Sequence, residues 1–357
     1  MTTDRTWFAN RSDPAWAPRA PDAAARAFHE RLAGYDVTPL AELPAIARRL
    51  GVGRVFAKDE SRRLGLPAFK ALGASWAVRR VLDRIGASDP VTVVSATDGN
   101  HGRAVARFAV QFGQRATVLV PTGVHPEAVR AIRAEGAEVV QVDGTYDDAV
   151  EMAGRLGDEN GHVLVQDTAW TGYEEVPRWI VDGYDTLFVE IDEQLAPRGV
   201  GRPDLVVVPT GVGSLLQAAL VHYRRADADA RTAVASVEPV NAACVQASLM
   251  AGRPVTVATG FTTMAGLNCG TVSSLAWPAI VAGLDAALVT DDRSAAHATD
   301  ALAEQGVDAG PCRAASLAAL FDVDDDDAFR SHVGIDGDAT VVLLVTEGTS
   351  ANPHHRG

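Results

Sequence analysis

Two lysines are the only side-chain amines in this chain of 357 residues, because arginine supplies the rest of its 32 basic residues. A reaction that needs a deprotonated amine can therefore use only Lys58 or Lys70. Lys70 follows an apolar, proline-containing turn and begins an alanine-rich segment that is typical of a helix. A free lysine titrates at about 10.4, desolvation lowers this pKa by up to roughly 3 to 5 units, and a helix N-terminus acts in the same direction. These conditions favour Lys70 as an amine that forms a Schiff base.

A glycine-containing loop, Thr210-Gly-Val-Gly-Ser214, joins an apolar strand to an apolar helix. The backbone N–H groups of Gly211, Val212, Gly213 and Ser214, together with the helix N-terminus, could bind a phosphate. A short Gly-x-Gly turn is also consistent with a purely structural role. A dinucleotide fingerprint is excluded because Leu216 stands where the third glycine is required, and a P-loop is excluded because neither lysine follows a glycine.

A second loop with anion-binding character is Ser95-Ala-Thr-Asp-Gly-Asn-His-Gly102, again between a strand and a helix. The N–H groups of Thr97 to His101 could bind a substrate carboxylate, and the amide of Asn100 could donate to a phenolate oxygen. Asp98 is unexpected there, since a negative side chain opposes anion binding unless a cation or a proton transfer requires it. A helix-capping role for Asp98 remains an alternative.

Asp167 follows the last strand of the same region and should emerge at the same sheet edge as Asp98. Two carboxylates beside an amine suit a substrate with an extra ammonium group, or proton abstraction from either face of a carbon. Loop capping is the alternative for Asp167. His101 and the other histidines lack metal-ligand spacing, so we expect no metal and treat His101 as a structural or a minor pocket residue.

Short β-branched runs alternate with amphipathic helical patterns and predict an α/β fold. Strands at 91–95, 116–120, 138–142 and 162–166 indicate a smaller, parallel four-stranded domain over residues 91–189. Strands at 204–209, 233–238 and 339–345 indicate a larger domain formed by residues 1–90 and 190–357. We expect two open twisted sheets flanked by helices, with the active site at the seam between the domains.

Composition restricts the partners. A net charge of −14 argues against nucleic acid or an anionic membrane surface and favours a small molecule. No apolar core of signal-peptide length lies in the first 30 residues, and no apolar run reaches 18 residues, so we expect a cytoplasmic protein. Cys244, Cys269 and Cys312 are too few for a disulfide framework, although a bridge between Cys244 and Cys269 stays open.

Taken together, these motifs resemble the fold type II enzymes that use pyridoxal 5'-phosphate, and among them the 2,3-diaminopropionate ammonia-lyase family. The resemblance covers residues 28–348. Six segments carry it: Tyr35-Asp-Val-Thr-Pro-Leu, Lys58-Asp-Glu-Ser, Gly65-Leu-Pro-Ala-Phe-Lys-Ala-Leu-Gly, Ala96-Thr-Asp-Gly-Asn-His-Gly-Arg, Gln166-Asp-Thr-Ala-Trp and Met264-Ala-Gly-Leu-Asn-Cys-Gly.

The resemblance implies a role for each motif. Lys70 would hold the cofactor as a Schiff base, Asn100 would contact its 3'-oxygen, Gly211 to Ser214 would hold its phosphate, and Thr346 would hydrogen-bond its pyridine nitrogen. Asp98 and Asp167 would act as bases for substrates of opposite handedness, with Thr97 and His101 in the substrate pocket. The implied reaction is α,β-elimination of D- or L-2,3-diaminopropionate through aminoacrylate to pyruvate and ammonia, in a homodimer.

Two alternatives remain open at this stage. One is a serine or threonine dehydratase, or a related β-elimination or replacement enzyme, and the other is a non-catalytic amino-acid-binding protein. Two segments depart from the family's pattern: Thr171 stands where a glutamate is usual, and Gly310-Pro-Cys-Arg-Ala-Ala replaces a smaller turn near the cofactor. These departures predict a changed pocket.

Overall fold

The computed structural model describes residues 6–86, 89–97, 99–225, 231–348 and 351. The described residues form two compact units: the larger unit lies within 6–21, 37–61 and 187–348, and the smaller unit lies within 22–36 and 62–186 and includes residue 351. The predicted domain boundary at residue 90 differs from this division. Helix α3 (Lys70–Ile85) packs along α4 (Asn100–Gln111) and is therefore part of the smaller unit.

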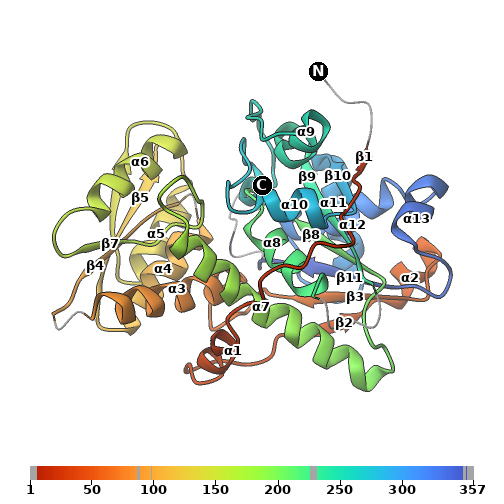
Figure 1. Cartoon of the computed structure of the whole chain (residues 1–357), viewed down its shortest axis with the longest axis horizontal. Helices are drawn as coiled ribbons and strands as arrows, with labels where there is room; N and C mark the ends of the chain where they lie inside the picture. The colour runs from red at the N-terminus through yellow and green to blue at the C-terminus, as the bar shows by residue number, and fades with distance from the viewer. Residues whose placement is uncertain (1–5, 87–88, 98, 226–230, 349–350, 352–357) are drawn as a thin grey trace. The chain divides into compact units, whose positions relative to one another are not determined.

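The smaller unit is built on a four-stranded sheet in the order β6-β5-β4-β7, and all its pairs are parallel, as the sequence predicted (Figure 1). Its strands are β4 (Thr92–Ala96), β5 (Arg115–Pro121), β6 (Glu138–Val142) and β7 (His162–Leu164). Because β4 and β7 are parallel neighbours, the loops after them emerge at the same edge of the sheet. These are the loops that contain residues 97–100 and Asp167.

Local sequence explains the helices that cover this sheet. Helix α5 (Pro126–Ala134) has proline in its first turn, and α6 (Tyr146–Gly157) starts with a reciprocal cap between Thr145 and Asp148. Ala149 and Ala153 of α6 pack against Val94 and Leu119 on one face. Helix α4 packs against β4 and β5, and the short α1 (Ala24–His29) packs against α3.

The larger unit contains a seven-stranded mixed sheet in the order β1-β10-β9-β8-β11-β3-β2 (Figure 1). The five inner strands are parallel, and the edge strands β1 and β2 are antiparallel to their neighbours. The strands are β1 (Trp7–Ala9), β2 (Leu40–Glu42), β3 (Arg54–Asp59), β8 (Leu205–Pro209), β9 (Ala233–Pro239), β10 (Ala286–Thr290) and β11 (Thr340–Val345). The sequence predicted β8, β9 and β11 and missed the other four.

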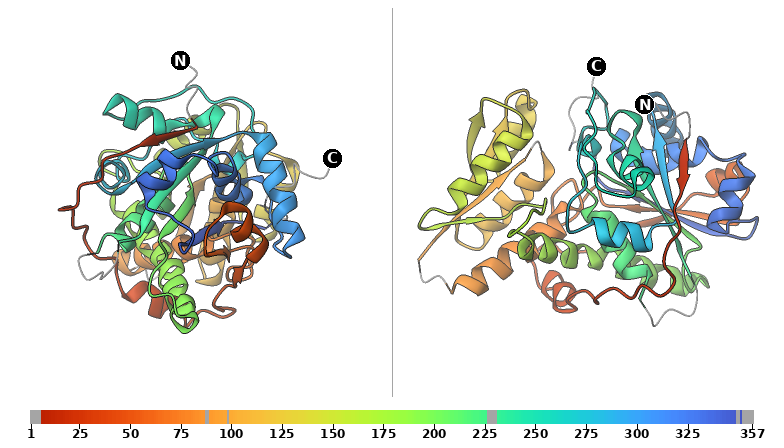
Figure 2. Two further views of the ribbon diagram at one scale, coloured as in Figure 1. Left: turned by 90° about the vertical axis from the view of Figure 1, so that its right-hand side faces the viewer. Right: turned by 45° about the horizontal axis from the view of Figure 1, so that its top comes forward.

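Both faces of this sheet are buried, which explains its nearly continuous apolar strands. Val207 and Leu343 lie in a core with Leu317, whereas Val206 and Val208, at alternate positions, are equally buried on the opposite face. Figure 2 shows helices on both faces. The helices are α2 (Pro44–Leu50), the part of α7 (Glu175–Leu195) after residue 186, α8 (Ser214–Tyr223), α9 (Cys244–Ala251), α10 (Trp277–Gly283), α11 (Asp292–Glu304), α12 (Pro311–Phe321) and α13 (Asp327–Val333), with 3-10 turns η1 (Ala196–Arg198), η2 (Val240–Ala242) and η3 (Ala265–Leu267).

The described residues contain no helix that combines the length and apolar character needed to cross a membrane.

Candidate active site

A tight turn fixes the start of the helix that carries Lys70. Leu64 and Gly65 both have positive φ, +52° and +73°, and the N–H of Leu66 donates to the carbonyl of Arg63 at 2.9 Å. Positive φ at both central residues is the signature of a type I′ turn. Among the described residues other than glycine, Leu64 alone has a positive φ. Such local strain is tolerated where the surrounding structure enforces it, and here it precedes the first residue of α3.

The structure brings Lys70 and Asp167 together within the smaller unit. Nζ of Lys70 donates to Oδ2 of Asp167 at 2.7 Å, although 97 positions separate them in the chain. The Lys70 side chain keeps 23% of its accessible surface and that of Asp167 keeps 9%. An amine and a carboxylate therefore meet in a site that is shielded from water but still open on the lysine side.

Asp167 is ionised despite its burial. Burial alone favours the neutral acid, but the positive charge that His101 carries when it is protonated at low pH, and the ammonium group of Lys70 with its hydrogen bond, lower the pKa of Asp167 to about 2. A carboxylate with so low a pKa is a weak base at neutral pH. Its basicity therefore depends on where the Lys70 proton is.

Tyr184 is a neighbour of this pair that the sequence reasoning missed. It lies on α7 and is fully buried, with its ring 4.8 Å from that of Phe69. Burial raises the pKa of its hydroxyl, and the positive charge of Lys70 opposes that rise. Gly73 of α3 permits the approach, because an added Cβ there would lie 2.5 Å from the Tyr184 ring. Gly73 is a signal in the sequence that another element packs closely against this helix. The sequence does not show that the element is the one that carries Tyr184.

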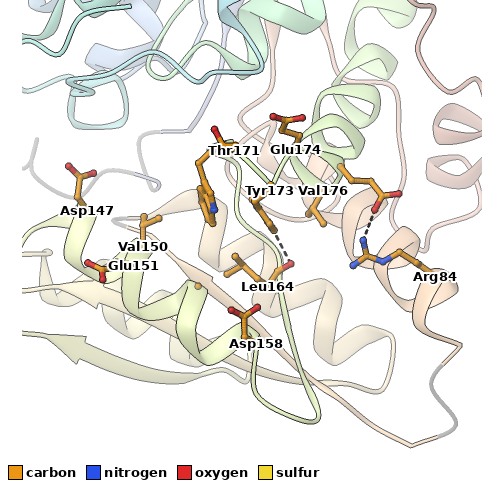
Figure 3. Close-up of a pocket in the computed structure, with 14 residues that line it drawn as sticks. Arg84, Asp147, Val150, Glu151, Asp158, Leu164, Thr171, Tyr173, Glu174 and Val176 are labelled. Atoms are coloured by element: carbon orange, nitrogen blue, oxygen red, sulfur yellow. Dashed lines mark hydrogen bonds and ion pairs between the residues drawn. The ribbon is translucent and has the colours of Figure 1, made fainter.

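The chain segment before Asp167 is fixed by side chains. The Tyr173 hydroxyl accepts from the N–H of Gln166 at 2.8 Å and donates to the carbonyl of Leu164 at 3.1 Å (Figure 3). The Gln166 side chain accepts from the N–H of Ala96 at 3.0 Å, which ties the end of β7 to β4. Asp167 is thus presented from a rigid strand end rather than from a free loop. The sequence analysis did not identify Tyr173 or the role of Gln166.

The loop after β4 begins α4 at Asn100. Thr97 is buried, and its hydroxyl accepts from the N–H of Gly99 at 3.0 Å. Gly102 has to be glycine, since an added Cβ would lie 2.3 Å from Thr97 Cγ2. Asp98, predicted as a second base, lies outside the described residues. His101 is 4% exposed, and its Nδ1 lies 3.7 Å from Asp167 Oδ2.

A separate cavity of about 800 Å³ lies in the smaller unit and is shown in Figure 3. Its walls include the stacked rings of Trp170 and Tyr173, 4.4 Å apart, and Thr171, the residue at which the chain departs from the family's pattern. None of the described residues predicted for the site lines this cavity. It is therefore adjacent to the Asp167 loop in sequence, but it is not the site that the motifs predict.

The loop predicted to bind phosphate, Gly211–Ser214, lies in the larger unit. Gly213 has φ of +100°, and an added Cβ on Gly211 would lie 2.9 Å from Cys269 Sγ. Gly213, at the N-cap of α8, has no side chain that could cap the helix, so the helix N-terminus keeps the electrostatic character that binds anions. Thr346 directly follows β11, which is the parallel neighbour of β8. The Gly211–Ser214 loop and Thr346 consequently emerge at the same edge of the sheet.

Residues around this loop include several that the sequence analysis did not assign. An added Cβ on Gly266 would lie 3.6 Å from Cys312 Sγ and 4.0 Å from Glu347 Oε2. Arg313, also in the segment that departs from the family's pattern, is fully buried. Cys244, Cys269 and Cys312 all carry free thiols. Cys312 of the segment 310–315 thus lies beside Gly266, whose carbonyl oxygen would lie 3.3 Å from an added Cβ on Gly211 of the predicted phosphate loop.

Lys58 has a structural position that differs from that of Lys70. It is fully buried, and its Nζ donates to Glu190 Oε2 at 2.7 Å, Gln194 Oε1 at 2.8 Å and the carbonyl of Thr38 at 2.8 Å. All three ammonium protons are therefore used. Lys58 is therefore a buried, ion-paired residue of the larger unit.

We expect Lys58→Met to lower the free energy of unfolding by about 3 to 5 kcal/mol, because it leaves the carboxylate of Glu190 buried without a counter-charge. Denaturant unfolding measures this loss. The matched double variant Lys58→Met/Glu190→Gln removes both charges and should recover part of the stability. A loss below about 1 kcal/mol in the single variant would contradict the buried ion pair.

Comparisons with known proteins agree with this arrangement. The family model described as pyridoxal-phosphate dependent enzyme matches residues 32–347. The diaminopropionate ammonia-lyase of Salmonella typhimurium is 36% identical over 91% of this chain and 88% of its own length. That of Escherichia coli K12 is 33% identical over 99% of this chain and 94% of its own length.

The fold agrees as well. A crystal structure of diaminopropionate ammonia lyase from Escherichia coli, in complex with an aminoacrylate-PLP azomethine reaction intermediate, superposes with a TM-score of 0.90. Its sequence is 32% identical, and the match covers 98% of this chain and 95% of that chain. The two sheets and their helices are therefore those of a fold type II enzyme. This chain belongs to the pyridoxal-phosphate dependent enzymes and, among them, to the diaminopropionate ammonia-lyase family.

Proposed function

We propose that this enzyme eliminates ammonia from 2,3-diaminopropionate and yields pyruvate and ammonia. The contact between Lys70 and Asp167 carries the proposal, since it pairs an amine able to bond to a carbonyl with a carboxylate able to remove a proton, 2.7 Å apart. The cofactor is pyridoxal 5'-phosphate. When bound, it accepts the electron pair left on the substrate carbon by loss of the α-proton.

The residues present fit this cofactor. Gly211, Val212, Gly213 and Ser214 would hold its phosphate, supported by the uncapped N-terminus of α8 and by glycines that cannot carry a Cβ without displacing their neighbours. Asn100 would donate to the 3'-oxygen, and Thr346 would hydrogen-bond the pyridine nitrogen. A neutral hydroxyl at Thr346 leaves the nitrogen unprotonated.

The protein's own groups bind and deprotonate the substrate. Thr97 and His101 would contribute to the substrate pocket, and Asp98 and Asp167 would remove the α-proton from substrates of opposite handedness. Asp167 could act as a base once Lys70 no longer donates to its Oδ2 as an ammonium group, because its pKa then rises. Loss of the β-amino group completes the elimination. The protein contributes orientation and proton transfer.

Turnover of D- and L-2,3-diaminopropionate, serine and threonine, measured side by side, tests the proposal. Diaminopropionate should give one pyruvate and two ammonia molecules, whereas serine gives one of each. Exclusive activity on the hydroxy amino acids would instead identify a dehydratase. A protein that binds these amino acids but converts none would be a sensor and would reject the proposed reaction.

We also infer that the enzyme is a cytoplasmic homodimer. Its three free thiols suit a reducing compartment. Phe261 and Val240 support self-association, since they are 84% and 51% exposed, and Asn241, the residue after Val240, donates from its Nδ2 to the carbonyl of Phe261. Sedimentation equilibrium should report twice the mass of the chain.

A further inference from the structure

One hydrogen bond determines the tautomer of His101. The ring is buried on α4, and its Nε2 lies 3.1 Å from the carbonyl oxygen of Val165. A carbonyl only accepts hydrogen bonds, so Nε2 carries the hydrogen. Burial lowers the pKa of His101, which keeps the imidazole neutral at neutral pH. Its Nδ1 therefore presents a lone pair.

That lone pair faces Asp167. Among the described residues, Nδ1 has no hydrogen-bond partner, and it lies 3.7 Å from Asp167 Oδ2. Two acceptors in a buried contact repel each other unless one of them receives a proton. Buried polar atoms are almost always paired, so an unpaired one next to a reactive carboxylate calls for a functional explanation.

We propose that Nδ1 of His101 receives the proton that Asp167 removes from the substrate, a step that rests on the proposed function. The substrate C–H bond breaks, its electron pair stays with the substrate and cofactor, and an O–H bond forms on Asp167 Oδ2. That O–H bond then breaks and an N–H bond forms on Nδ1, which leaves a carboxylate and an imidazolium ion. The imidazolium returns its proton to the ammonia that the reaction releases, and ammonium departs.

The groups around the pair decide when the transfer occurs. Lys70 from α3 supplies the donor to Oδ2 and, as a cation, disfavours protonation of His101, whereas Asp167 favours it. Tyr184 from α7 and Tyr173 from the loop after Asp167 have raised pKa values and stay neutral. When Lys70 loses its proton or moves away from Oδ2, no ammonium charge of Lys70 disfavours protonation of His101. The proton on Asp167 can then move to Nδ1. A separation of 3.7 Å needs only to close to hydrogen-bonding distance, as catalytic contacts commonly do with substrate bound.

His101→Gln is the matched test. The glutamine amide can still donate to the carbonyl of Val165, but it offers no nitrogen that titrates. With the enantiomer whose turnover depends on Asp167, we expect kcat of the holoenzyme to fall about tenfold or more, and the pH profile of kcat/KM to lose the titration of the pair. The opposite enantiomer should keep its wild-type profile.

A second readout needs neither cofactor nor turnover. Nitrogen-15 NMR of the imidazole should show the neutral Nε2–H form. The pKa of His101 should fall further in Asp167→Asn, which removes a favourable negative charge, and should rise in Lys70→Ala, which removes an unfavourable positive charge. An Nδ1–H tautomer, or a pKa unaffected by both changes, overturns the proposal even if His101→Gln does not fold.

His29→Gln is the control for loss of a buried imidazole. His29 is fully buried in the same unit, and its two nitrogens contact Thr186 Oγ1 at 2.8 Å and the carbonyl of Leu72 at 3.0 Å. This variant should lower stability and leave the pH profile unchanged. A wild-type profile in His101→Gln would reject the proton transfer while leaving the proposed function intact. Failure of the wild-type enzyme on both enantiomers would reject the function, and the NMR result would then decide on His101 alone.

Discussion

Lys70→Ala should reduce turnover by roughly a thousandfold or more and remove the visible absorption of the lysine-bound cofactor. Lys70 is the one amine in the chain that can take this role. Its Nζ is part-exposed beside a carboxylate, whereas all three protons of the other lysine, Lys58, are used inside the larger unit. The strained turn at Leu64 and Gly65 further fixes where α3 begins.

Borohydride reduction of the holoenzyme, followed by peptide mapping, identifies directly the lysine that is bonded to the cofactor. With two lysines in the chain, the label should appear in the peptide that contains Lys70. Lys58→Met provides the matched control: it should unfold more easily yet keep the visible band when folded. Persistence of the band in Lys70→Ala, or label on the Lys58 peptide, would show that the assignment is wrong.

The smaller sheet was predictable because its signals are local. Strands β4 and β5 are runs of buried, largely β-branched residues separated by a helix with clear apolar periodicity. Parallel strands joined by helices have their carboxyl ends at one edge, so the shared position of the loops after β4 and β7 followed from strand order alone. Three-residue edge strands such as β1 and β2 are too short to show any period, and they escaped prediction.

The contacts that tune the site were not predictable, since they depend on distant segments. The sequence identified Lys70 and Asp167 as reactive groups, but not that they form an ion pair. Tyr184 reaches them only because Gly73 lets α7 approach α3. Likewise, the ion-pair partner of Lys58 is Glu190, which lies 132 positions away in the chain. Packing over long sequence separations decides burial, and burial decides these pKa values.

Asp167→Asn should lower turnover of one enantiomer of diaminopropionate by roughly 10²- to 10⁴-fold, the usual contribution of a general base. Asparagine keeps the size of the side chain and can accept a hydrogen bond from Lys70, but it cannot take a proton. Gln166 and Tyr173 hold the backbone at this point, so the substitution should leave the loop in place. The effect should therefore appear in kcat more than in KM.

The opposite enantiomer is the internal control, because it presents its α-proton to the other side of the cofactor, where Asp98 is proposed as the base. Asp98→Asn should show the reverse preference. Steady-state kinetics on both enantiomers with each variant separate the two roles: a base acts on one face of the substrate, whereas a general electrostatic role affects both. Equal losses on the two enantiomers in Asp167→Asn would mean that its negative charge, and not its ability to accept a proton, is what the reaction requires.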